Sequence, residues 1–253
     1  MITITPPTRV EHVMGTAVLF DIRDRQFPQD ALEEAASILH WVDATFSVFK
    51  HDSEISRITR GELALTDADV RVQVVLATCE ILRRDTAGAF DHRPDGKLDP
   101  SGYVKGWAVE RAARILAGSG IDSFLVSAGG DIVARGVPSA GRTWEIGIRD
   151  PLDPDAILGT VNLVDNAIAT SGLYERSDHI RRAGKSGDVP ASVSIVGPDL
   201  GIADALATAV FASGVEDSGW LNNFPAYDLI AVTSDRRILR SQTAPFTSAA
   251  VAI

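Results

Sequence analysis

The stretch KGWAVERAARILAGSGIDSFLV, residues 105–126, decides the fold class of this chain. Residues 105–117 predict a helix, and the Gly-Ser-Gly triplet at residues 118–120 predicts its end. The apolar residues 123–126 then predict a strand. A helix that leads directly into a strand indicates a mixed α/β arrangement.

The residues before this stretch predict one strand region and two further helices. Residues 10–24 alternate as in a strand or hairpin, and residues 28–49 carry apolar positions at helical spacing with acidic residues in the first turn. Residues 66–84 predict another helix, which Thr66 or Asp67 could cap. Its expected buried stripe is Val70, Val74, Val75, Ile81 and Leu82.

The second half of the chain predicts mostly strands. Apolar and β-branched runs indicate strands at residues 132–134, 144–148, 158–163, 167–170 and 192–196, a helix at 202–213, and a hairpin formed by 228–233 and 238–242. No Ser/Gly linker, low-complexity tract or clear repeat divides the chain. We therefore expect a single domain over residues 1–253.

Composition excludes several classes of protein. The 253 residues include 24 Lys and Arg against 34 Asp and Glu, which gives a net charge of −10 and disfavours a general nucleic-acid binder. No apolar run approaches the roughly 18 residues of a membrane span. The single cysteine, Cys79, rules out an internal disulfide and is expected to be a buried structural thiol. With no signal peptide or lipid-carrying cysteine at the amino terminus, we expect a cytoplasmic protein.

Several well-known motifs are absent. The triplet Gly184-Lys185-Ser186 resembles part of a P-loop, but His179 occupies the position of the required first glycine. No G-x-G-x-x-G, H-E-x-x-H or G-x-S-x-G occurs. Dinucleotide dehydrogenases, zincins and α/β-hydrolases therefore have no motif to support them.

The motif LDPSGYVKGWAVE, residues 98–110, places a tight turn before the start of a helix. Unpaired backbone N–H groups at a helix start, together with Lys105 and the flanking glycines, suit a phosphate. An ordinary capped helix with a solvent-facing lysine is the alternative interpretation.

A second motif, GIADALATAVFASG, occupies residues 201–214. Asp204 and Thr208 are four residues apart, so on a helix their oxygens project from one face and could bind a hard cation. The alternative is a capping aspartate and a threonine that bonds its own backbone.

In AIATSGLYERSDHI, residues 167–180, a strand ends in two hydroxyl residues and a glycine, and His179 follows in a polar segment. A histidine there can act as an acid or base near neutral pH. A surface histidine without a role is the alternative. The glycine-containing segments SAGGD and TAGAFD add weaker signals, because glycines permit a close backbone approach.

Taken in order, these segments resemble the ApbE family, the FAD:protein FMN transferases. The resemblance covers nearly the whole chain, and the TAGAFD-to-DPSG spacing and YER sequence resemble the actinobacterial branch. The matching pieces are MGT (14–16), FSVFKHDSEISRI (46–58), TAGAFD (86–91), LDPSGYVKGWAVE (98–110), SAGGD (127–131), ATSGLYER with HI (169–180) and ADALATA (203–209).

The resemblance implies an α+β fold, with antiparallel or mixed sheets flanked by helices, and Mg²⁺-dependent transfer of FMN from FAD to a threonine hydroxyl of a target flavoprotein, releasing AMP. Mn²⁺ is the alternative metal. The implied metal shell is the Gly102 carbonyl, the Asp204 carboxylate and the Thr208 hydroxyl, with His179 as the candidate proton carrier. The implied FAD contacts are Met14, Phe49, Ala89, Phe90, Asp91, Asp99, Lys105 and Ile180.

Two positions depart from the family pattern. Residues 181–187, RRAGKSG, replace the Asp-Pro and Thr-Gly that usually follow HI, and Phe49 stands where a tyrosine is common. Phe49 could still stack on a flavin but has no hydroxyl to donate. The altered segment after His179 leaves a FAD-binding carrier without transfer activity as one alternative. The resemblance also implies a second alternative, a metal-dependent FAD pyrophosphatase that gives FMN and AMP.

Overall fold

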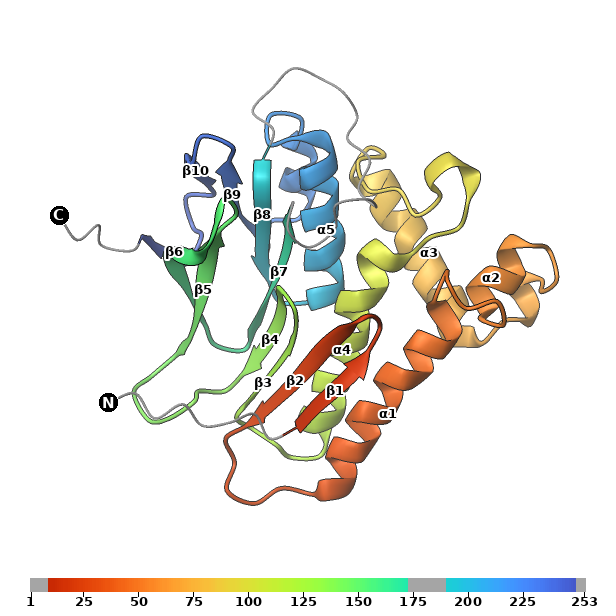
Figure 1. The fold of residues 1–253 in the computed structure, drawn as a ribbon, viewed down its shortest axis with the longest axis horizontal. Helices are drawn as coiled ribbons and strands as arrows, with labels where there is room; N and C mark the ends of the chain where they lie inside the picture. Colours follow the sequence, from red (N-terminus) through yellow and green to blue (C-terminus); the bar gives the residue numbers. More distant parts are fainter. Residues whose placement is uncertain (1–8, 173–189, 249–253) are drawn as a thin grey trace.

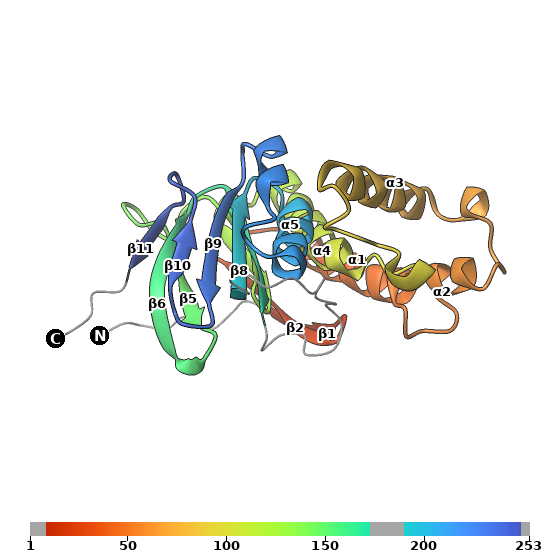
Figure 2. The ribbon, with the colours of Figure 1, turned by 90° about the horizontal axis from the view of Figure 1, so that it is seen from above.

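The fold is given by a computed structural model that describes residues 9–172 and 190–248. Figure 1 shows strands β5, β6, β9 and β10 at the left and helices α2 and α3 at the right, with the β1–β2 hairpin lying in front of α4 and beside α1. Seen from above in Figure 2, the sheets form one end of the molecule, while α2 and α3 lie at the opposite end. The expected α+β class with antiparallel sheets flanked by helices is confirmed.

The main sheet has eight strands in the order β1-β2-β3-β4-β7-β8-β9-β10, and each neighbouring pair is antiparallel. The expected amino-terminal and carboxy-terminal hairpins are β1–β2 and β9–β10. The strands are β1 (Arg9–Val13), β2 (Thr16–Ile22), β3 (Phe124–Ala128), β4 (Asp131–Arg135), β7 (Asn166–Gly172), β8 (Pro190–Gly197), β9 (Asp228–Thr233) and β10 (Ile238–Arg240).

A second, three-stranded sheet has the order β11-β6-β5. Its strands are β5 (Trp144–Asp150), β6 (Asp153–Leu163) and β11 (Phe246–Ser248). Trp144, Val161 and Phe246 of this sheet pack with main-sheet residues such as Ile168 and Val196. One face of the main sheet is thereby covered by apolar side chains from the smaller sheet.

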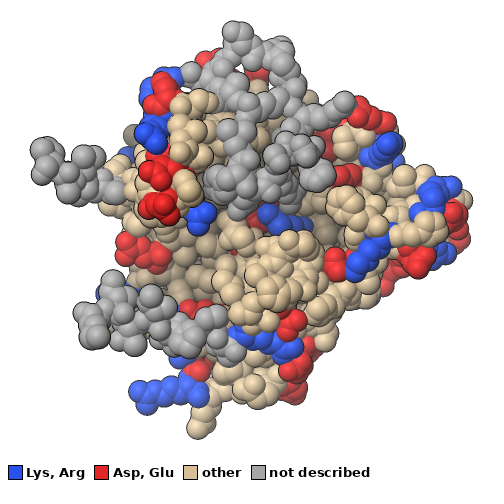
Figure 3. All heavy atoms as spheres, in the orientation of Figure 1, with Lys and Arg blue, Asp and Glu red and all other residues tan. Residues whose placement is uncertain are grey.

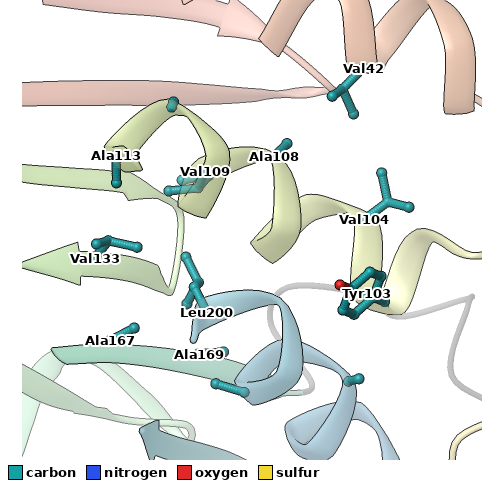
Figure 4. Close-up of a cluster of buried hydrophobic side chains, with 14 of the residues drawn as sticks. Val42, Tyr103, Val104, Ala108, Val109, Ala113, Val133, Ala167, Ala169 and Leu200 are labelled. Carbon is teal, nitrogen blue, oxygen red and sulfur yellow. The ribbon is translucent and has the colours of Figure 1, made fainter. Parts of the chain in front are cut away.

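Helices pack against the main sheet around α4. Figure 4 shows α4 between Val42 of α1 and the strand residues Val133, Ala167 and Ala169, with Leu200 of α5 close by. The side of α4 that faces α1 and the side that faces the sheet are both buried, because small and β-branched residues recur along this helix. The helices are α1 (Gln29–Phe46), α2 (Glu54–Thr59), α3 (Val70–Asp85), α4 (Ser101–Gly118) and α5 (Leu200–Ser213), with 3₁₀ turns at Leu65–Asp67, Pro94–Gly96 and Gly219–Asn223.

Two expectations for the helix at residues 66–84 were wrong. Asp69 caps α3 by accepting a hydrogen bond from the backbone N–H of Arg71, whereas Leu65–Asp67 form a separate 3₁₀ turn. The expected stripe also mixed two faces: Val75 and Leu82 are buried, but Val70, Val74 and Ile81 are exposed. The buried face of α3 is Val72, Val75, Leu76, Cys79 and Leu82.

The visible surface mixes charges of both signs. In Figure 3, blue and red side chains alternate over the end of the molecule formed by α1 to α3. Arg71 pairs with Asp69 and Arg83 pairs with Glu80, which balances the charge locally. Within residues 9–172 and 190–248, no helix is long and apolar enough to cross a bilayer.

Candidate functional site

The site lies where the backbones of α4 and α5 pack in close contact. A Cβ on Gly106 would lie 2.5 Å from the Leu200 carbonyl oxygen and 2.8 Å from Cβ of Asp204. Real Cβ atoms do not approach backbone so closely, so this contact requires glycine at residue 106. The short distance brings the backbone of α4 within reach of side chains on α5.

Asp204 uses this contact to bond directly to the backbone of α4. Its side chain is 2% exposed, and Oδ2 accepts a hydrogen bond from the N–H of Gly106 at 3.0 Å. In a regular helix that N–H would bond to the carbonyl of Gly102, four residues earlier. A carbonyl oxygen has two lone pairs, so the Gly102 carbonyl can accept that bond and still offer a lone pair to another ligand.

Thr208 lies one turn along α5 and faces Gly102. A Cβ on Gly102 would lie 3.4 Å from Thr208 Oγ1, and Ser171 Oγ of β7 lies 3.5 Å from the same hydroxyl. The three residues named as the metal shell therefore converge at one end of the helix crossing. A carbonyl, a carboxylate and a hydroxyl form a hard oxygen donor set, which fits Mg²⁺ or Mn²⁺ with water or phosphate completing the shell.

This donor set differs from a carboxylate-rich or histidine-rich metal centre. Across the described ranges 9–172 and 190–248, no group of three or more His, Cys, Asp and Glu side chains is arranged to hold a metal. Any metal at this crossing would depend on backbone and hydroxyl oxygens beside one carboxylate. Such a shell needs oxygens from a ligand to balance the cation's charge.

A cavity of about 760 Å³ opens beside this convergence. It falls within the size range of small-molecule and cofactor sites. Six of the expected site residues line it, namely Ala89, Phe90, Asp91, Asp99, Gly102 and Thr208. The structure thus brings the expected nucleotide-binding loop and two of the three expected metal ligands to one hollow.

The loop between α3 and α4 is built to present residues 89–91 to this cavity. Thr86 Oγ1 donates to the Leu82 carbonyl at 2.8 Å and accepts from the N–H of Phe90 at 3.0 Å. Ala87 and Gly88 have positive φ, which lets the chain reverse at that point. Phe90 is buried, so its ring anchors the loop in the core.

His92 lies buried under the same loop. Burial lowers the pKa of its imidazole below the ordinary value of a histidine. Its backbone carbonyl accepts the N–H of Asp99 at 2.9 Å, which joins the two ends of the cavity loop. Asp99 Oδ1 in turn accepts from the N–H of Ser101 at 3.1 Å, at the start of α4.

Lys105 makes an ion pair that the sequence did not reveal. Its Nζ lies 2.7 Å from Oδ2 of Asp131, whose side chain is fully buried, and Oδ1 of Asp131 accepts from the N–H of Thr170 at 3.3 Å. The lysine is therefore not the solvent-facing residue of the alternative interpretation. Asp131 is the last residue of the SAGGD motif. The glycines of that motif marked the segment in the sequence, but nothing in the sequence identified Lys105 as the partner of Asp131.

The remaining expected residues lie apart from this cavity or outside the described residues. Met14 is in the β1–β2 turn with a φ of 54° and lines a separate hollow of about 420 Å³. Phe49 is 82% exposed, and it does not line the main cavity. His179 and Ile180 fall within residues 173–189, outside the described part of the chain.

Two cationic residues lining the cavity were not anticipated. Arg60, at the end of α2, lines the cavity while bonding to Glu62 and to the carbonyl of His51. Lys97 lines it from the loop before α4. Both could oppose the negative charge of a phosphate, although neither lies in a recognisable phosphate motif.

The fold and the cavity define a class of protein: an α+β scaffold with a nucleotide-sized cavity beside a hard-oxygen site at a helix crossing. Residues 92–230 match the profile of the ApbE family, which is more than half of the chain. The chain therefore belongs to the ApbE family.

Known relatives agree with this assignment. The chain is 36% identical over 168 residues to a protein from Treponema pallidum named FAD:protein FMN transferase, a match covering 57% of this chain and 46% of the relative. It is 30% identical over 135 residues to the protein of that name from Escherichia coli K12, covering 49% of this chain and 38% of the relative. The matches span about half or less of the length of these curated relatives.

Solved structures share the fold over nearly the full chain. The flavin transferase ApbE from Vibrio cholerae aligns with a TM-score of 0.78 and 21% identity, covering 92% of this chain and 95% of that one. An ApbE protein from Thermotoga maritima aligns with a TM-score of 0.76 and 22% identity, covering 93% and 96%. At these identities the structural similarity establishes the fold.

Proposed function

We propose that this chain transfers FMN from FAD to a threonine hydroxyl of a flavoprotein acceptor and releases AMP, with Mg²⁺ as the metal and Mn²⁺ as an alternative. The observation that carries the proposal is the convergence of Gly102, Asp204 and Thr208 beside a cavity of about 760 Å³. The shared name of the relatives, FAD:protein FMN transferase, supports the same activity.

In the proposed reaction, the acceptor threonine Oγ forms a bond to the phosphorus of the FMN half. The bond between that phosphorus and the bridging oxygen breaks, and AMP leaves with the oxygen. The bound metal would neutralise charge on the pyrophosphate oxygens. His179 is proposed to take the proton from the threonine hydroxyl.

The other proposed roles concern the dinucleotide. Ala89, Phe90, Asp91 and Asp99 are proposed to contact FAD because they line the cavity at the loop before α4. Lys105 is proposed to act close to the phosphates while Asp131 holds its ammonium group. Met14, Phe49 and Ile180 are proposed as further FAD contacts from the family resemblance.

Three further assignments belong to this proposal. The short interval between residues 86–91 and 98–102, with the YER sequence at 174–176, supports a place in the actinobacterial branch. The single cysteine supports a reducing compartment such as the cytoplasm. The main apolar core contains residues from β1 through β9, which supports one working domain.

One assay separates this function from its alternatives. The protein is incubated with FAD and Mg²⁺, with a Ser/Thr-containing acceptor peptide or with the same peptide in which alanine replaces the acceptor residue. We expect an FMN adduct by mass spectrometry, equimolar AMP, and no adduct on the alanine peptide. AMP released at the same rate without acceptor would instead establish a pyrophosphatase. FAD binding without AMP or adduct would establish a carrier.

A further inference from the structure

The contacts between α4 and α5 form a ladder with a regular spacing. Gly102 faces Thr208, Gly106 faces Asp204, and Glu110 faces Leu200. Along α4 the contacting residue advances by four, and along α5 it falls by four. The two helices are thus antiparallel at this crossing, with one contact per helical turn, about 6 Å apart.

The first two contacts of the ladder contain the proposed metal ligands, whereas the third contains Glu110. Its side chain is 3% exposed in the middle of α4. Oε2 accepts a hydrogen bond from the N–H of Leu200, the first residue of α5, at 3.3 Å. A carboxylate at a helix amino terminus satisfies an otherwise unpaired donor and interacts favourably with the helix dipole.

The other oxygen of Glu110 holds two arginines. Oε1 lies 2.9 Å from a terminal nitrogen of Arg135 on β4 and 3.1 Å from Nε of Arg114 on α4. Arg114 also reaches Oδ2 of Asp199, the residue that caps α5. One carboxylate therefore joins α4, α5 and the sheet, and its charge is balanced by these partners.

We propose that Glu110 is a positioning residue that sets the register between α4 and α5, and thereby the geometry of Gly102, Asp204 and Thr208. The glycines at residues 102 and 106 allow close approach, but they carry no side chain that would resist sliding along the helix axis. The hydrogen bond between Gly106 and Asp204 and the polar contacts of Glu110 supply that resistance, and those of Glu110 lie outside the proposed metal site. This inference rests on the proposed function only for its effect on metal binding.

The test compares Glu110→Ala with Glu110→Gln, which remove the same charge. Glutamine still offers an oxygen to the N–H of Leu200, whereas alanine does not. We expect the Mn²⁺ dissociation constant, measured by electron paramagnetic resonance with FAD present and no acceptor, to rise about tenfold in Glu110→Ala and about threefold in Glu110→Gln. The metal concentration for half-maximal AMP release should rise in parallel, with kcat at saturating metal unchanged.

Asp150→Asn is the matched control. Asp150 is also a buried carboxylate that holds an arginine, Arg236, and accepts a backbone N–H, that of Leu152, but it lies on β5 of the other sheet. Its loss should leave the Mn²⁺ dissociation constant within twofold of the original. Circular dichroism verifies that each variant is folded at the assay temperature.

A second readout needs no metal. Hydrogen exchange at the Gly106 amide should accelerate at least tenfold in Glu110→Ala relative to an amide in the middle of β8, because the Asp204 contact shifts. A folded Glu110→Ala variant with unchanged exchange and unchanged Mn²⁺ affinity would overturn the inference, as would equal effects of alanine and glutamine. If Glu110→Ala does not fold, Glu110→Asp, with the charge one methylene shorter, takes its place under the same criteria.

Failure of the proposed function would look different. An original chain that binds Mn²⁺ but releases no AMP would refute the activity while the register test stands. An original chain that binds no Mn²⁺ in the presence of FAD would refute the metal assignment, and the Gly106 exchange rate would still decide the role of Glu110.

Discussion

Asp204 occupies a position where one carboxylate serves both the fold and the proposed chemistry. Its Oδ2 accepts from the Gly106 N–H, and the side chain is buried against α4. An asparagine could preserve the hydrogen bond through its amide oxygen while removing the charge. These two contributions can therefore be separated by a single substitution.

We expect Asp204→Asn to lower metal affinity by more than about 100-fold, because a neutral amide is a poor ligand for a hard cation. The free energy of unfolding should change by less than about 1 kcal/mol, since the Gly106 hydrogen bond is kept. Isothermal titration with Mn²⁺ and urea unfolding measure the two quantities. Asp228→Asn, at the start of β9, is the control and should change neither. Full metal affinity in Asp204→Asn would exclude this carboxylate from the shell.

At the scale of the element, the α4–α5 crossing depends on small residues. Gly106 has no room for a methyl group, whereas nothing lies within 4 Å of a Cβ on Gly118 at the end of the same helix. The two glycines differ in their surroundings but share the helix. They form a matched pair for testing the tight crossing.

Gly106→Ala is expected to destabilise the protein by about 2 kcal/mol or more, because the helices must separate to relieve the overlap with Leu200. Gly118→Ala should instead be neutral or stabilising by up to about 1 kcal/mol, because alanine restricts the unfolded chain. Chemical denaturation measures both changes. Equal effects of the two substitutions would contradict the close contact at Gly106.

The start of α3 is held by a charged pair. Asp69 accepts from the N–H of Arg71 and pairs with its guanidinium, which lies 3.4 Å from the centre of the Trp41 ring. These contacts with Arg71 lower the pKa of the Asp69 carboxyl from 3.8 to about 2. Because the folded pKa is lower than the unfolded one, the pair adds stability above about pH 4, and this stability is lost as pH falls toward 2.

We expect Asp69→Asn to cost about 0.5 to 1 kcal/mol at neutral pH, a small value because the pair is partly exposed. Asparagine still caps the helix, so the cost reports the ion pair. The difference in unfolding free energy between the two proteins should persist to about pH 4 and shrink below it. A difference that grew on acidification would show that the carboxylate is not stabilised in the fold.

At the scale of the whole molecule, the single thiol reports on the integrity of the core. Cys79 is buried in α3, and burial raises its pKa to about 12. At pH 8 the buried thiol is therefore protonated, so a thiol reagent should not react until the core opens.

We expect the folded protein to resist modification by an aromatic disulfide reagent for hours at pH 8, and to give one reactive thiol per chain in concentrated urea. In Cys79→Ser, an added Ala77→Cys, exposed on the same helix, should react within minutes and serves as the positive control. Rapid stoichiometric labelling of the folded original would contradict the buried environment of Cys79.

Local sequence signals predicted most helices and strands, but they did not predict which face of α3 is buried and which is exposed. The hairpin at residues 10–24 and the strands around residues 124–135 follow from alternation and turns within a few residues. The buried face of α3 did not follow, because valines and isoleucine occur on both sides of that helix and only packing into the main core selects one. Val70 remains 67% exposed despite its apolar side chain.

The amino-acid sequence alone predicted the family, the α+β class and several residues that line the cavity, because ordered motifs and helical spacing are local properties. Tertiary structure decided which of these residues meet. The Gly106–Asp204 hydrogen bond joins residues 98 positions apart, and Lys105 pairs with Asp131 across a helix and a strand. Such contacts depend on the register between packed elements, and no local pattern in the chain encodes that register.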